Sequence, residues 1–134
     1  LTAWKHTDGF DEWMFIDHVD DDFCMKLHLA GYRIVRSNKA VLYQRAGEMA
    51  FRRFPFGKRL RLFGYSPFRV YYITRNTVYF IRKYWRTINK FRELTKFVYS
   101  SGRMFLFEKN RFKVFPSFVR GLHDGLKQKV DKKT

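Results

Sequence analysis

Residues 66–99 read SPFRVYYITRNTVYFIRKYWRTINKFRELTKFVY, and this stretch decides the fold that the sequence predicts. Ser66 can cap a helix, and Pro67 is tolerated at the first helical position, where its missing N–H costs nothing. We expect one helix from Pro67 to about Tyr99, roughly 50 Å long at ~1.5 Å per residue. Its sides differ in character, which predicts an amphipathic, cationic helix. The apolar side holds Val78, Phe80, Ile81, Tyr84, Trp85, Ile88 and Phe91, and the basic side holds Arg82, Lys83, Arg86 and Lys90.

The segments on either side of this stretch carry turn signals. After it, residues 100–102 (Ser-Ser-Gly) predict a break, and Pro116 with Ser117 predicts the start of a last helix. Before it, residues 48–66 hold glycine, proline and clustered arginine and lysine without sustained periodicity. We expect this segment to be a basic loop or linker.

The region further upstream predicts a short helix followed by two strands. Asp20 or Asp22 can cap a helix that ends before Gly31, since glycine suits the left-handed position after a helix. Residues 32–36 and 40–44 are rich in β-forming side chains and flank a polar turn. The expected fold class is therefore an α+β fragment, mostly α-helical, with a short helix and two short strands followed by a long amphipathic helix and a C-terminal helix.

Charge divides the chain into two parts of opposite sign. The net charge is +16, yet the segment 1–22 holds seven acidic side chains and one lysine. The remainder of the chain, 23–134, holds all the other lysines and arginines. A basic excess attracts anionic partners such as nucleic acid, acidic lipid head groups or phosphorylated substrates. The acidic side chains of the first segment are Asp8, Asp11, Glu12, Asp17, Asp20, Asp21 and Asp22.

Further features of the sequence concern the cellular compartment and the relation of the chain to a membrane. The single cysteine, Cys24, excludes an intramolecular disulfide and fits a reducing compartment such as the cytoplasm. No run approaches the ~18 apolar residues that a spanning helix requires. The chain begins with Leu1 and no signal peptide precedes the acidic segment, so we expect it to be part of a longer protein.

Seven carboxylates within the segment 1–22 indicate a metal site, a cationic ligand or a general base, because like charges placed together destabilise a compact state. The alternative is a solvated acidic loop that offsets the basic part. The four histidines show no spacing typical of metal ligands, so no metal site is predicted from them.

The order of residues resembles the late catalytic segment of family-2 glycosyltransferases, and most closely their rhamnosyltransferase branch. The resemblance rests on residues 9–12, 15–17, 19–24 and 29–34 (Gly-Phe-Asp-Glu, Phe-Ile-Asp, Val-Asp-Asp-Asp-Phe-Cys and Leu-Ala-Gly-Tyr-Arg-Ile). Residues 66–76 and 121–126 are similar to that branch as well. The resemblance implies the C-terminal portion of a GT-A fold.

What the resemblance implies is an inverting sugar transfer, in which a carboxylate takes the proton of an acceptor hydroxyl. Asp20 matches the aspartate of the family's Glu-Asp pair and is the expected base. Val19 stands where many relatives have the glutamate, so Asp17 stays an alternative. Asp22 is expected mainly to cap a helix, with a direct catalytic part as the alternative.

Substrate contacts are expected around two further blocks. Asp11 and Glu12 match acceptor-site positions, with a structural role as the alternative. Arg69, Tyr72, Arg75 and Asn76 fall in the part that resembles the family's Tyr-Tyr-x-x-Arg-Asn block, where arginine forks suit phosphate oxygens. The alternative for this block is that it fastens the basic part to the acidic segment.

The resemblance also implies the remaining parts of the enzyme. We expect dTDP-rhamnose as donor, a cell-surface polysaccharide or lipid-linked acceptor, and a divalent cation (Mg or Mn) whose ligands lie mostly in the N-terminal half of the catalytic domain, outside these residues. The fragment alone is expected to be inactive. The expected domains are 1–47 for the catalytic part, 48–66 for the loop and 67–134 for the helical tail.

The tail is expected to lie on an anionic membrane surface at the inner face of the cell membrane. Trp85, Arg82, Arg86 and Lys90 are the expected membrane-facing residues, because tryptophan opposite a basic side is typical of an interfacial helix. The alternative for this helix is that its apolar side packs on the catalytic domain or on another subunit. For the function, a nucleic-acid-binding module and a non-enzymatic membrane scaffold are the alternatives, and both leave the acidic segment without a role. No specific nucleic acid is expected as a partner.

Overall fold

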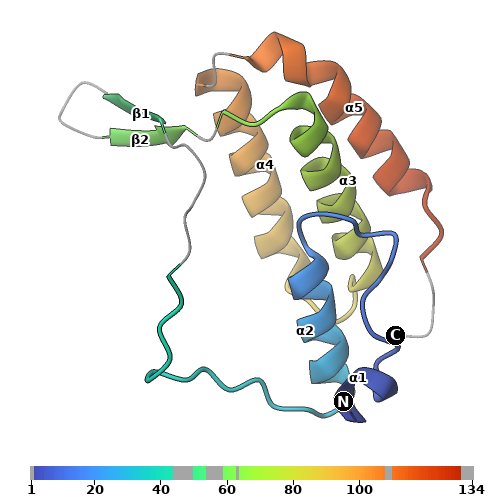
Figure 1. Cartoon of the computed structure of the whole chain (residues 1–134). Coiled ribbons are helices and arrows are strands. Elements are labelled where there is room, and N and C mark those ends of the chain that lie inside the picture. The colour runs from blue at the N-terminus through green and yellow to red at the C-terminus, as the bar shows by residue number, and fades with distance from the viewer. Residues whose placement is uncertain (1, 44–49, 54–58, 63, 108–109, 131–134) are drawn as a thin grey trace.

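A computed structural model describes residues 2–43, 50–53, 59–62, 64–107 and 110–130 of the chain. These residues are mainly helical, with one two-stranded antiparallel hairpin in which Ala50 pairs with Leu62 and Arg53 with Arg59 (Figure 1). The elements are α1 (Thr2–His6), α2 (Val19–Leu29), β1 (Ala50–Arg53), β2 (Arg59–Leu62), α3 (Pro67–Lys83), α4 (Lys90–Phe107) and α5 (Arg111–Lys127).

Helix α3 is the centre of the fold, because the other parts of the chain pack on it from several directions. It contacts both α4 and α5, while α2 and the segment before it lie across it (Figure 1). Its middle part is buried, and polar as well as apolar side chains lie in this buried part. The buried residues of α3 are Val70, Thr74, Arg75, Asn76, Val78, Tyr79, Phe80 and Ile81.

Helix α5 approaches α3 unusually closely through two glycines one turn apart. A Cβ atom added to Gly121 would lie 2.5 Å from the carbonyl oxygen of Tyr71, and one added to Gly125 would lie 2.6 Å from that of Arg75. Only glycine allows the two backbones to approach this far. Arg82 then donates hydrogen bonds to the Gly125 and Gln128 carbonyls at 2.7 and 2.9 Å, which satisfies the C-terminal end of α5.

The main apolar core joins the acidic segment to α3. Met14, Tyr79, Phe80 and Tyr84 are buried together, with Trp13 among the side chains packed against them. The acidic segment is therefore held on α3 by packing as well as by charge.

Two helix ends follow the predictions from sequence. Ser66 Oγ accepts a hydrogen bond from the Arg69 N–H at 3.3 Å and Pro67 begins α3, so the predicted start is confirmed. Gly31 is left-handed, with φ of 81°, and its N–H donates to the His28 carbonyl while that of Tyr32 donates to the Leu27 carbonyl. These are the two hydrogen bonds of a Schellman motif.

The predicted α+β class is wrong in the two strands that defined it. Residues 32–36 and the described part of 40–44 form no strand, and Gln44 lies outside the described residues. Val35, Val41, Leu42 and Tyr43 are exposed. β-branched and aromatic residues favour a strand only when a neighbouring strand and a covered face are present, and the described chain gives this segment neither. The hairpin lies instead in the predicted loop, 48–66.

The predicted single helix over 67–99 is also wrong, because it is interrupted at residues 84–89. The Tyr84 side chain is drawn into the core, and a turn follows in which Asn89 Oδ1 accepts from the Arg92 N–H at 3.1 Å and caps α4. Helix α4 then continues through residues 100–102, where a break was predicted. The tertiary contacts of Tyr84 therefore outweigh the continuous helical periodicity of the sequence over 67–99.

The last helix begins earlier than predicted, at Arg111, so that Pro116 lies inside α5. Proline removes the N–H that would bond to the Phe112 carbonyl. Phe112 is exposed, so water can reach this carbonyl, and the loss is tolerated near the start of the helix.

Candidate functional site

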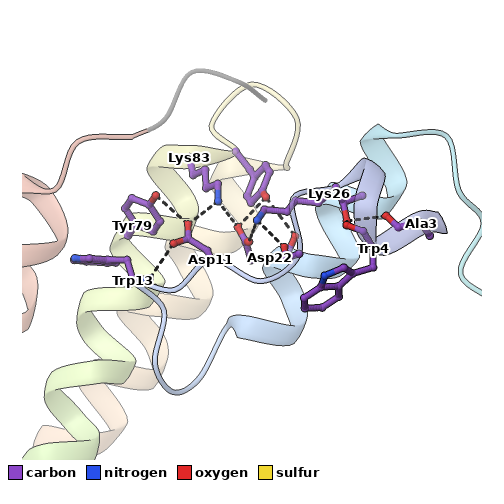
Figure 2. Close-up of polar contacts among 11 residues, drawn as sticks. Ala3, Trp4, Asp11, Trp13, Asp22, Lys26, Tyr79 and Lys83 are labelled. Carbon is purple, nitrogen blue, oxygen red and sulfur yellow. Dashed lines mark hydrogen bonds and ion pairs between the residues drawn. The ribbon is translucent and has the colours of Figure 1, made fainter. Parts of the chain in front are cut away.

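The acidic segment is divided between two neighbouring sites, and the first is a closed ion cluster centred on Asp22. The Asp22 side chain is fully buried, and its Oδ1 lies 2.7 Å from Lys83 Nζ. The same nitrogen lies 2.8 Å from Asp11 Oδ2, so a lysine that is only 4% exposed bridges two carboxylates (Figure 2). Buried charges persist in proteins when they are paired in this way.

Further donors complete the cluster. Tyr84 donates its hydroxyl to Asp22 Oδ1 at 2.8 Å, and Tyr79 donates to Asp11 Oδ2 at 3.1 Å. Lys26, one helical turn after Asp22, lies 3.4 Å from Asp22 Oδ2 and donates to the Gly9 carbonyl (Figure 2). The cluster thus joins α2, the segment before it and α3.

The environment shifts two pKa values in directions that match this arrangement. Burial alone would raise the pKa of Asp11, but the hydrogen bond and charge of Lys83 bring it below its ordinary value. Burial raises the pKa of Tyr84, and the adjacent Asp22 carboxylate raises it further. Asp11 therefore stays ionised and Tyr84 stays protonated at neutral pH, so the cluster serves to hold the fold. The predicted capping role of Asp22 is wrong, since its carboxylate points into this cluster.

The second site is a strained turn immediately before α2. Asp17 and His18 have positive φ angles of 60° and 61°, a conformation that side chains other than glycine adopt at an energetic cost. Asn76, which is fully buried, donates from Nδ2 to the carbonyls of Ile16 and Asp17. The turn is therefore held from below by α3.

The His18 ring fixes the other half of this turn. It stacks on Phe80 with ring centroids 5.3 Å apart, and its Nε2 lies 2.9 Å from Thr77 Oγ1. Its Nδ1 lies 2.9 Å from Asp21 Oδ2, and this neighbour lowers the pKa of Asp21. Two consecutive left-handed residues are thus maintained by contacts with three residues of α3. Strain held in place this way is common where a side chain must face a ligand.

A cavity of about 330 Å³ opens beside Asp17. Asp17 Oδ2 is buried and has no hydrogen-bond partner among the described residues, while its Oδ1 lies 3.6 Å from the Arg69 guanidinium. The walls come mainly from α3 and α4. The lining residues are Asp17, His18, Asp21, Tyr65, Val70, Ile73, Thr74, Phe97, Ser100, Ser101, Arg103, Met104 and Phe118.

The remaining predicted site residues fall into exposed and buried groups. Asp20 and Glu12 are exposed, and Asp20 makes no ion pair with the part of the chain that is described. Tyr72 is half-buried between Phe15 and Phe68. Arg75 is buried, lies 3.8 Å above the Trp13 ring and donates to the Trp13 carbonyl. Arg75 and Asn76 therefore fasten the acidic segment to α3, which was the alternative considered for them.

The predicted membrane-facing residues are separated by the break after α3. Arg82 turns inward to the end of α5, where it binds the two carbonyls of Gly125 and Gln128. Trp85, Arg86 and Lys90 are exposed at the connection between α3 and α4, where Lys90 Nζ lies 5.1 Å from the Trp85 ring centroid.

Lys83, Tyr84 and His18 bind carboxylates of the acidic segment, and the sequence analysis did not predict these contacts. The spacing of Asp22 and Lys26, one turn apart on a helix, was a signal for an ion pair. Lys83 gave no such signal, since its partners Asp11 and Asp22 lie far upstream of it in the sequence.

No group of three or more histidine, cysteine, aspartate or glutamate side chains in the described residues could hold a metal ion. The triplet Asp20, Asp21 and Asp22 does not fit a divalent cation, because Asp22 is bound to two lysines and Asp21 to His18. None of the described helices is long and apolar enough to cross a bilayer.

Comparisons with protein-family models, with curated proteins and with solved structures find no match to this chain. These comparisons therefore assign the chain to no family.

Proposed function

We propose that this chain carries the acceptor side of an inverting glycosyltransferase, and that either Asp17, in the strained turn, or Asp20, in the first turn of α2, supplies its general base. The observation that carries the proposal is the Asp17 carboxylate, which lines a cavity, is partly exposed, has one oxygen without a hydrogen-bond partner among the described residues, and stands on a backbone with positive φ. The resemblance to family-2 glycosyltransferases gives the reaction class.

The proposed reaction needs one proton acceptor on this chain. The carboxylate takes the proton of an acceptor hydroxyl as the hydroxyl oxygen attacks the anomeric carbon of the donor sugar. The new glycosidic bond forms while the bond to the nucleoside diphosphate breaks, and the diphosphate leaves with the electron pair. The residues that bind the donor are proposed to lie outside this chain, and no step here involves the divalent cation.

Asp17 and Asp20 support the proposal in different ways. Asp17 faces the cavity beside the cationic side chain of Arg69. Asp20 is exposed and unpaired within the described residues, so it is open to a substrate from outside the chain, and the resemblance favours it. Asp11 and Asp22 are less suitable because they lie 2.8 and 2.7 Å from the buried Lys83 ammonium. Asp21 is less suitable because it is bound to the His18 ring, whereas the Arg69 partner of Asp17 is half-exposed and lies 3.6 Å away.

The cavity itself is suited to the acceptor. Its walls combine apolar side chains with the hydroxyls of Ser100 and Ser101 and the guanidinium of Arg103. A sugar hydroxyl attached to an apolar or phosphorylated carrier would find complementary groups there. A lipid-linked saccharide is the acceptor class proposed, with dTDP-rhamnose as donor, and the protein is proposed to work from the cytoplasm on the inner face of the cell membrane.

The test is sugar transfer by the complete protein that contains this chain. Asp17→Asn and Asp20→Asn are compared with the parent, and Asp8→Asn serves as control because Asp8 is exposed and also has a positive φ. Asparagine tolerates this backbone conformation, so Asp17→Asn should fold normally. Removal of the base should lower kcat by about 10²- to 10⁴-fold and leave nucleotide binding nearly unchanged.

The two variants identify the base, because only one of them should show this loss with KM and nucleotide affinity retained. Full turnover in both Asp17→Asn and Asp20→Asn would remove the turn from the mechanism. Absence of transfer by the complete parent protein from any of a panel of nucleotide sugars, tested with lipid-linked saccharides, would refute the reaction class.

A further inference from the structure

The α4–α5 pair presents an apolar surface that nothing in the described chain covers. Helix α4, which is described over its whole length, buries none of its residues. Phe91, Val98 and Leu106 are exposed and lie seven and eight positions apart, so they follow one side of the helix. Thr95 and Gly102 fill the gaps in this stripe without a charge. An exposed apolar stripe of this length indicates a binding surface.

Helix α5 carries a second stripe that meets the first. Phe112, Phe115, Val119 and Leu126 are exposed at spacings of three, four and seven positions. Phe105 of α4 contacts Phe115 of α5, with ring centroids 5.7 Å apart, and Leu106 follows Phe105 directly. The buried side of α5, which holds Gly121 and Gly125, faces α3, so the stripe lies on another side of the helix. The two stripes therefore form one apolar face.

Basic side chains border this face on both helices. On α4, Arg92, Lys96 and Arg103 follow one edge of the stripe by helical spacing, and on α5 Lys113, Arg120 and Lys127 follow the far edge. The two helices hold eight lysines and arginines against two carboxylates, Glu93 and Asp124. Both carboxylates are engaged, Glu93 with Arg92 and Lys96, and Asp124 with the Tyr71 hydroxyl, His123 and, at 3.9 Å, Arg120.

We propose that this α4–α5 face, defined by Phe91, Val98, Leu106, Phe112, Phe115, Val119 and Leu126, docks on an anionic lipid bilayer. Apolar side chains enter the acyl boundary while bordering cations bind the head groups. Four of the seven side chains that define the face are aliphatic, which suits acyl chains, whereas base stacking would use only the three phenylalanines. The proposal rests on the membrane location in the proposed function and replaces the surface around Trp85 with a different one. The docking proposal does not depend on whether Asp17 or Asp20 is the general base.

The test is co-sedimentation of the full chain with vesicles of phosphatidylcholine and phosphatidylglycerol in a two-to-one ratio, compared with vesicles of pure phosphatidylcholine. The variant F91S/V98S/L106S/F112S removes exposed side chains and should lower the affinity for anionic vesicles at least about tenfold. The control V41S/L42S removes apolar side chains that are equally exposed elsewhere, and it should bind like the parent.

Charge is tested separately. The variant R92Q/K96Q/K113Q/K127Q should lower binding to anionic vesicles by about fivefold for each cation that reaches the head groups. Circular dichroism tests whether the variants keep their helices. If the variant with four serine substitutions loses them, F91S/F112S replaces it, because both of these side chains are 80% exposed.

Three outcomes would overturn the docking proposal. They are equal vesicle binding by the serine variant and the parent, a loss of binding confined to W85S/R86Q/K90Q, and a stable dimer in solution that the serine substitutions dissociate. Asp17→Asn should sediment like the parent, so that failure of the base assignment and failure of the docking surface are distinguishable.

Discussion

The closed cluster around Asp22 and the open turn at Asp17 use carboxylates from the same acidic segment in opposite ways. Asp22 has no exposed surface and two lysines and a tyrosine hydroxyl as partners. Asp17 is partly exposed, and one of its oxygens has no hydrogen-bond partner in the described chain. The difference teaches that a run of acidic residues is not one site. Carboxylates paired with buried Lys83 hold this fold, whereas Asp17, which is partly exposed, is one of the two proposed bases.

The largest expected effect breaks the closed cluster. Asp22→Ala leaves Lys83 with Asp11 alone in a buried site and should destabilise the chain by about 3–5 kcal/mol, because an uncompensated buried charge is costly. Urea unfolding measures it. Asp20→Ala, close to the strained turn, should change stability by only about 0.5 kcal/mol, as is usual at exposed positions. Similar losses in both variants would show that Asp22 is no more structural than Asp20.

The next effect concerns the packing of α5 on α3, the helix that contacts both the closed cluster and the open turn. Gly125→Ala places a Cβ against the Arg75 carbonyl and should cost about 1–3 kcal/mol through overpacking. Gly102→Ala in α4 is the matched control, because no described atom lies within 4 Å of the added Cβ. Alanine should stabilise that helix by about 0.5–1 kcal/mol. A thermal unfolding series that gave both variants the same sign would contradict the close approach.

A smaller effect sharpens the account of the open turn. Asp17→Gly removes the strain of a left-handed non-glycine residue and should stabilise the chain by about 1 kcal/mol, while the proposed transfer activity is lost. Asp20→Gly lies within α2 and should destabilise it by about 0.5–1 kcal/mol. Destabilisation by Asp17→Gly in urea unfolding would mean that the Asp17 side chain serves the fold.

The last effect is an alkaline pH dependence to which Tyr84 of the closed cluster contributes. The pKa of Tyr84 is raised above its ordinary value of 10.0, so the folded chain keeps this proton when the unfolded chain has lost it. The stability from Tyr84 is therefore fully present below pH 10.0 and declines as the pH rises above it. Tyr84→Phe should lose about 0.5–1.5 kcal/mol at neutral pH and show a shallower alkaline decline. The free energy of unfolding of the parent and of Tyr84→Phe is measured at pH values below and above 10.0. Parallel profiles of the two proteins would refute a contribution of Tyr84 to the alkaline decline.

Local signals were sufficient for several parts of the fold. Ser66 and Pro67 predicted the start of α3, and Gly31 predicted the end of α2, because capping and left-handed glycine act within a few residues. The acidic segment was recognised as a region of interest, and Asp17 was among its candidates. The resemblance to glycosyltransferases and the domain boundaries stay predictions.

Three predictions were wrong, and the sequence held no signal against them. They are the strands at 32–36 and 40–44, the uninterrupted helix to Tyr99 and the capping role of Asp22. A strand depends on a partner, and the described segment has none. The break after Lys83 depends on Tyr84 reaching Asp22, which is 62 residues away in the chain. The sequence likewise could not show that Arg75 and Asn76 hold the acidic segment.

The sequence by itself determined where helices can begin and end, how charge is distributed, and which residues are able to remove a proton, since these depend on local backbone preferences and side-chain chemistry. Only the tertiary structure decided which carboxylates are paired with a buried lysine and which are exposed or line a cavity. That choice depends on contacts between side chains far apart in the sequence, where burial and the distance to a lysine or arginine set the energy of each charge.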